Sequence, residues 1–211
     1  MSCPSKLRFR FKTHIGLATT LAIIFLGLLS YWATHRTHQI YMPKPIGYCR
    51  INLPEQRYQS LTNDFPYRFE YSIHAQLRPP TSKYKMDYWI NLYYPDFDAT
   101  IYLSYQSVRG NHAILRGLCE SARILASKHQ VQASSIEESI IQTPKGYQVH
   151  VIELFGQVPT PFQFYTTDGQ KHFLRGALYF KTATQSDFLA PVIAFIKKDI
   201  IHMLHTLEWK K

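Results

Sequence analysis

The sequence predicts an α+β domain in which a mainly antiparallel β-sheet is covered by two long helices, preceded by one N-terminal transmembrane helix. Segments of alternating apolar and polar residues stand before and after one helical repeat, and a second helical repeat lies near the C-terminus. An uncharged apolar run near the start predicts the membrane helix.

The composition is that of a folded protein. The chain has 211 residues, of which 45% are hydrophobic, and this excludes a disordered tail or a collagen-like repeat. Its length fits one domain with an appendage. Only three cysteines occur, at positions 3, 49 and 119, which excludes a disulfide scaffold and a Cys-rich zinc module. Whether Cys49 and Cys119 form a bridge stays open.

The apolar run covers residues 15–32 and predicts a transmembrane signal anchor. Four cations precede it without an acid: Lys6, Arg8, Arg10 and Lys12. We therefore expect 1–14 to be a cytoplasmic basic segment, 33–47 a tether and 48–211 a periplasmic α+β domain. The expected localisation is the inner membrane, single-pass, with the C-terminal domain in the periplasm, where nucleic acid is no partner.

A cleavable secretory signal is the alternative for the same run, because it has the same order of basic and apolar parts. A cut after Ala33 would leave bulky Tyr31 at the third position before the cut. These residues make a poor cleavage site for a signal peptidase, so the uncleaved anchor is favoured.

Strand signals follow the tether. The expected early strands are 48–53, 67–74, 87–94 and 100–106, with a loop over 55–64. Pro95-Asp96 predicts the break between the last two.

The second half of the domain has clearer signals. Apolar residues at helical spacing follow Gly110-Asn111, with Asn111 as the expected cap. Two hairpins follow, 135–143 with 146–155 and 162–167 with 172–180, and a final amphipathic helix runs over 187–207.

No reaction signature is present. His202, His205 and Glu208 have a spacing that can hold a metal, but solvated residues on a helix face explain them better. There is no Gly-rich phosphate loop and no nucleophile elbow. We therefore predict no enzyme, no catalytic residue, no metal site, no cofactor and no small-molecule substrate.

The tyrosines are the most informative residues for binding, because some of those in strands must face away from the helices. The ones concerned are Tyr93, Tyr94, Tyr102, Tyr105, Tyr165 and Tyr179. Core packing explains most of them, and an exposed remainder would be a binding surface.

Several motifs resemble the gliding-motility-associated lipoproteins of Bacteroidetes called GldD. They are Met42-Pro43-Lys44-Pro45-Ile46-Gly47-Tyr48, Asp64-Phe65-Pro66-Tyr67, Trp89-Ile90-Asn91-Leu92, Leu103-Ser104-Tyr105, Gln163-Phe164-Tyr165-Thr166-Thr167-Asp168, Lys171-His172-Phe173-Leu174-Arg175-Gly176-Ala177-Leu178-Tyr179-Phe180, Ala190-Pro191-Val192-Ile193 and Leu207-Glu208-Trp209. The lipidated cysteine of that family is missing after Leu28-Leu29-Ser30, where Tyr31 stands.

The resemblance implies a non-enzymatic, envelope-anchored accessory protein of the gliding apparatus and its allied type IX secretion machinery. Such a protein would bind and stabilise partner envelope proteins, and would contact the inner membrane through residues 15–32. The order of strands and helices also resembles the PsbP/Mog1-type α/β/α sandwich, an analogy of fold alone.

The hairpin around residues 168–175 is the expected partner-binding surface. The candidate residues are Lys171, His172, Arg175, Tyr165 and Tyr179. Two alternatives remain: a glycan- or lipid-binding module, which a closed apolar pocket would favour, and a cryptic hydrolase, which His172 near both an acid and a hydroxyl would favour.

Overall fold

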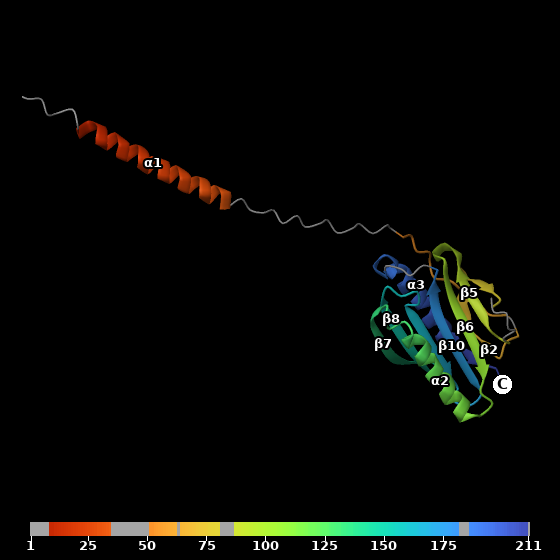
Figure 1. The fold of residues 1–211 in the computed structure, drawn as a ribbon. Helices are drawn as coiled ribbons and strands as arrows, with labels where there is room; N and C mark the ends of the chain where they lie inside the picture. Colours follow the sequence, from red (N-terminus) through yellow and green to blue (C-terminus); the bar gives the residue numbers. More distant parts are fainter. Residues whose placement is uncertain (1–8, 35–50, 63, 81–86, 182–185, 211) are drawn as a thin grey trace, which may run out of the picture. The chain divides into compact units, whose positions relative to one another are not determined.

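The structure is a computed structural model that describes residues 9–34, 51–62, 64–80, 87–181 and 186–210 (Figure 1). The chain divides into two compact units, Met1–Gly47 and Tyr48–Lys211. Most of the expected tether, and Tyr48 to Arg50 of the first expected strand, lie outside the described residues.

In the first unit the structure describes the helix α1 (Phe9–Thr34). Within the described part of the chain, no helix has both the length and the apolar character that a membrane crossing requires. The expected transmembrane helix over 15–32 is therefore corrected to a helix without a membrane span among the described residues.

The second unit is an α+β domain, as predicted. Its elements are β1 (Tyr58–Ser60), β2 (Tyr67–Arg68), β3 (Glu70–Ser72), β4 (Gln76–Arg78), β5 (Ile90–Tyr94), the 3₁₀ turn η1 (Pro95–Phe97), β6 (Ala99–Ser107), α2 (His112–Ser127), β7 (Ala133–Gln142), β8 (Gln148–Gly156), β9 (Phe162–Thr167), β10 (His172–Phe180), α3 (Ser186–Thr206) and β11 (Glu208–Trp209).

One large antiparallel sheet organises the domain, in the order β4-β5-β6-β10-β9-β8-β7. At its centre β10 pairs with β6 along nine positions, from His172 opposite Ser107 to Phe180 opposite Ala99. Because side chains alternate between the two faces of a strand, this register decides which residues of β10 meet each helix. Two small pairs, β1 with β3 and β11 with β2, complete the fold.

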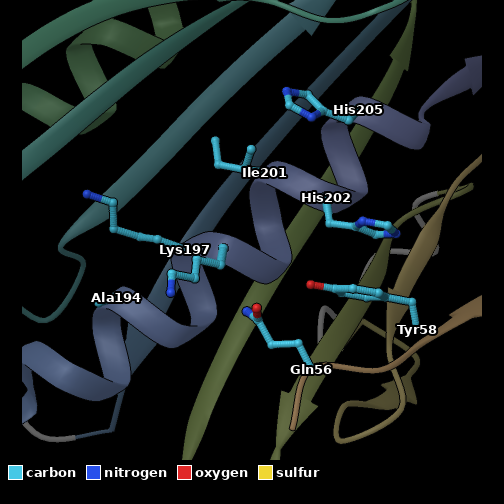
Figure 2. A pocket seen from close by; sticks show the side chains of 8 residues that line it. Gln56, Tyr58, Ala194, Lys197, Ile201, His202 and His205 are labelled. Atoms are coloured by element: carbon cyan, nitrogen blue, oxygen red, sulfur yellow. The ribbon is translucent and has the colours of Figure 1, made fainter.

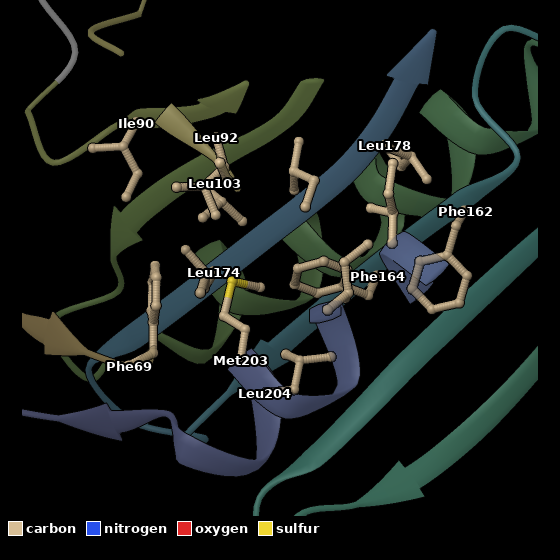
Figure 3. Packing of buried hydrophobic residues seen from close by; sticks show 14 of the residues in the cluster. Phe69, Ile90, Leu92, Leu103, Phe162, Phe164, Leu174, Leu178, Met203 and Leu204 are labelled. Atoms are coloured by element: carbon tan, nitrogen blue, oxygen red, sulfur yellow. The ribbon is translucent and has the colours of Figure 1, made fainter. Parts of the chain in front are cut away.

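The main core lies between one face of the sheet and α3 (Figure 3). Leu174 and Leu178 alternate along β10 toward this face, and Met203 and Leu204 of α3 pack against the same cluster. All four are at most 2% exposed. Burying side chains of this size is worth about 1.5 to 3 kcal/mol each, so this layer dominates the stability of the domain.

The opposite face carries α2, which packs on β9 and β10. Phe173 and Tyr165 are buried there with Ala122 of the helix. The helix begins where expected, because the Oδ1 of Asn111 accepts hydrogen bonds from the backbone N–H of Ala113 (2.9 Å) and Ile114 (3.2 Å). Helices thus lie on both faces of the sheet.

Some expected boundaries are wrong. No strand covers residues 51–53, and β1 lies inside the expected loop over 55–64. The two helices that cover the sheet are not long: α2 has 16 residues and α3 has 21, both within the ordinary range of globular helices.

Candidate functional site

The turn between β9 and β10 is built around Asp168. Its Oδ1 accepts backbone hydrogen bonds from Gln170 (3.0 Å), Lys171 (2.8 Å) and His172 (2.9 Å). Burial alone would raise the pKa of Asp168, but these three donors hold it below its usual range. The carboxylate therefore organises the turn rather than facing a partner.

Two of the expected binding residues are covered by the protein itself. His172 is 9% exposed and Tyr165 is 2% exposed. The Nδ1 of His172 shares a 2.8 Å hydrogen bond with the Tyr105 hydroxyl, and its ring stacks on Trp209 at a centroid distance of 5.1 Å. Burial lowers the pKa of His172, so its ring is neutral at pH 7.

Lys171, by contrast, is exposed and lines a pocket of about 580 Å³ at this end of the sheet. The backbone N–H groups of Val108 and Gly110 bind the carbonyls of Lys171 and Gln170, both at 2.7 Å, and so join the β6–α2 loop to the hairpin. Arg109 and His112 also line this pocket. It is a cationic, solvent-open surface.

Arg175 and Tyr179 lie on the α2 side of β10 and belong to a different surface. We call it the open tyrosine face and define it by Arg78, Tyr93, Tyr102, Arg175 and Tyr179. The register places Tyr93, Thr100 and Tyr179 in one row across β5, β6 and β10. Of the six strand tyrosines, Tyr94, Tyr105 and Tyr165 are buried, at 7% exposed or less.

The aromatic rings of this face are arranged for contact with a partner. Tyr102 is 44% exposed and meets Tyr179 edge to face, with ring centroids 5.5 Å apart. The Arg78 guanidinium lies 3.6 Å above the Tyr93 ring, and the Tyr93 hydroxyl donates to Asp98 (3.1 Å). These contacts hold the rings in place and leave part of the tyrosine surface exposed to solvent.

Arg175 is half-buried beside the rings. Its Nη2 donates to the Oε1 of Gln163 at 2.7 Å, and burial lowers its pKa. Within the described ranges no carboxylate lies at ion-pair distance from it. A partly buried guanidinium without an ion pair is stabilised when a binding partner supplies a carboxylate.

A second pocket, the α3 pocket, lies on the outer surface of α3 (Figure 2). It has a volume of about 550 Å³ and is open to solvent. Its lining comprises Gln56, Tyr58, Ala194, Lys197, Lys198, Ile201, His202 and His205. From the sequence, His202 and His205 were noted only for their spacing. Gln56 and Tyr58 were not predicted to lie here, because no local pattern connects them to α3.

The candidate metal ligands near the C-terminus do not converge. His202 pairs with Glu70, whereas Glu208 pairs with Arg68 and Lys145. In the described part of the chain, no group of three or more His, Cys, Asp or Glu residues is placed to hold a metal ion. Cys119 has a free thiol, and Cys49 lies outside the described residues.

A family model described as the gliding motility lipoprotein GldD matches residues 38–209. The chain belongs to the GldD family. This corrects the expected localisation, because a lipoprotein is held by a lipid and no described helix is able to span a membrane; the single-pass inner-membrane assignment is wrong.

Comparison of this GldD-family chain with curated proteins found no match. Among solved structures it is similar to the solution structure of cyanobacterial PsbP (CyanoP) from Synechocystis sp.. The identity is 10%, the TM-score is 0.45, and the match covers 78% of this chain and 99% of the other.

Proposed function

We propose that this member of the GldD family works without catalysis, as an accessory component of the gliding apparatus and its allied type IX secretion machinery. It acts by binding and stabilising partner envelope proteins through the open tyrosine face. The observation that carries the proposal is the edge-to-face pair of Tyr102 and Tyr179 beside the half-buried Arg175, which has no ion-pair partner among the described residues.

The composition of the face supports a protein partner. Tyrosine and arginine are enriched among the residues that carry most of the binding energy at protein interfaces. A tyrosine offers a large contact area for few rotatable bonds, and each ring here is already positioned by a neighbour. Pre-positioned rings lose little conformational entropy when a partner binds.

The charge of the face supports an acidic partner segment. Arg175 has no carboxylate at ion-pair distance among the described residues, and Arg78 is held by Gln76 (3.0 Å) and the Tyr93 ring. An aspartate or glutamate from the partner would pair with a guanidinium that is already partly out of water, where such a pair is strong.

The hydrolase alternative is not favoured by the surroundings of His172. Its ring has a hydroxyl neighbour in Tyr105, but Asp168 reaches this residue through the backbone N–H, not through the ring. Burial raises the pKa of the Tyr105 hydroxyl, which makes it a poor nucleophile near neutral pH.

The test is a quantitative co-purification from the native host after cross-linking. The double variant Tyr102→Ala/Tyr179→Ala should lose about 90% or more of the partner signal, as expected for paired aromatic hot spots. Arg57→Ala, an exposed residue elsewhere on the domain, is the control, and Lys171→Ala tests the hairpin surface separately.

Unchanged partner yields from a double variant that melts like the wild type would remove the open tyrosine face from the proposal. If Lys171→Ala alone abolished the partner signal, the binding surface would be the hairpin pocket instead.

A further inference from the structure

The α3 pocket has the size of a small-molecule site and belongs to a different helix layer from the open tyrosine face. Sites for small ligands usually measure about 300 to 1,000 Å³, and this one measures about 550 Å³. Figure 2 shows Gln56 and Tyr58 on one side of α3, with Ile201 and His205 along the helix.

One wall of the pocket is held in place before any ligand arrives. The Nε2 of Gln56 donates to the Phe195 carbonyl (3.4 Å) and to Oδ1 of Asp199 (3.3 Å). The Tyr58 ring stacks on His202 at 3.6 Å with an interplanar angle of 9°. His202 is in turn held by the Glu70 carboxylate at 2.8 Å. Little ordering is therefore required on binding.

The floor of the pocket is apolar. Ala194, Lys198, Ile201 and His205 follow one another at intervals of four, three and four residues, so they share one face of α3. Ala194 and Ile201 supply hydrocarbon surface, and the methylene chain of Lys198 extends it. A ligand body in this pocket meets mainly carbon.

The rim of the pocket is cationic. Lys197 pairs with Glu153, but within the described residues no carboxylate is at ion-pair distance from Lys198 or His205. The nearby acids are engaged elsewhere: Asp199 is 2% exposed and accepts a hydrogen bond from Tyr94, and Glu70 pairs with His202. The charge left for a ligand to neutralise is positive.

We propose that the α3 pocket binds a single-chain anionic amphiphile of the fatty carboxylate class. Its hydrocarbon chain lies over Ala194 and Ile201, and its carboxylate pairs with Lys198. A pocket of this volume takes one acyl chain, whereas the two chains and glycerol of a phospholipid need more room. This site is independent of the proposed partner-binding surface.

The test is a calorimetric titration of the full-length protein with decanoate, compared with the uncharged isostere decanamide. Decanoate should bind saturably and one to one, with decanamide about tenfold weaker or more. Because every variant keeps α1 unchanged, any uptake by that apolar helix is common to all samples.

Three variants locate the ligand. Ala194→Trp fills the floor at an exposed helix position and should weaken decanoate binding by about tenfold or more. Lys198→Glu should weaken decanoate binding but leave decanamide binding nearly unchanged. Lys171→Glu makes the same charge change at the distant hairpin and should leave the decanoate affinity as in the wild type.

Unchanged decanoate affinity in a folded Ala194→Trp protein would overturn the proposal, as would equal affinities for decanoate and decanamide. Binding to phosphatidylglycerol vesicles without binding to decanoate would also overturn it, in favour of a membrane surface. None of these outcomes bears on partner capture by the open tyrosine face, which is measured separately.

Discussion

The ring of Phe164 lies directly over the backbone of Gly176, its partner across the β9–β10 pair. A β-carbon at residue 176 would overlap the ring atoms of Phe164. This glycine is needed for space rather than for an unusual backbone angle, because the ring occupies the volume of the missing side chain.

We expect Gly176→Ala to lower the free energy of unfolding by about 2 kcal/mol, a typical cost of overpacking a core. Urea unfolding measures it. The double variant Gly176→Ala/Phe164→Leu should cost less than the sum of the two single variants, because the smaller side chain makes room. Additive costs would show that the ring and the glycine are not coupled.

The elements with the clearest local signals were predicted correctly. The hairpin over 162–167 and 172–180 and the helix after Asn111 are confirmed, because turn residues and caps act over a few positions. The early strands were less predictable. β2 and β11 are two residues long and pair with each other only because the chain end returns to β2, and the three-residue β3 forms by pairing with β1.

The candidate site was only partly predictable, for a related reason. Alternation shows that strand tyrosines occupy two faces, but not which face a helix covers. That depends on β6 lying next to β10, a pairing between segments far apart in the chain. Likewise, nothing local joins Tyr58 to His202, although their rings stack.

A second prediction concerns Asp199, a carboxyl group that is 2% exposed. Burial raises its pKa despite hydrogen bonds from Tyr94 and Gln56. The folded state therefore holds this proton more tightly than the unfolded chain, and stability from this group is lost as the pH rises from about 4 through the folded pKa.

The variant Asp199→Asn should remove that loss. Compared with the wild type, its free energy of unfolding should rise between pH 4 and pH 7, as measured by urea unfolding at each pH. A wild-type protein that gains stability over the variant as the pH rises would contradict the prediction.

A third prediction concerns His129, His150 and His172. Burial is the main cause that lowers the pKa of all three. In NMR titrations of the folded protein, the pKa of each ring should lie below the unperturbed value of about 6.5. In the protein unfolded in urea, each pKa should return to near that value. Because the folded state binds these protons more weakly, stability should fall as the pH drops below about 6.5. A folded-state midpoint above 6.5 for any of the three would refute its assignment.

A fourth prediction concerns the start of α2. Replacing Asn111 by Ala removes the acceptor for two backbone N–H groups and should cost about 1 kcal/mol of stability. Asn111→Asp keeps a side-chain acceptor and is the matched control, with stability close to the wild type in thermal melts. Equal losses in both variants would mean that the amide nitrogen, and not the cap oxygen, matters.

The central pairing of β6 with β10 also governs how this protein can be made. A ribosome delivers β6 well before β10, with α2 and three further strands synthesised in between. Until the last third of the chain has emerged, β6 presents an unpaired edge, and unpaired edges invite association with other chains. A messenger truncated before the codon for His172 would lack β10 and would therefore leave β4-β5-β6 and β9-β8-β7 as two half-sheets without their shared central strand.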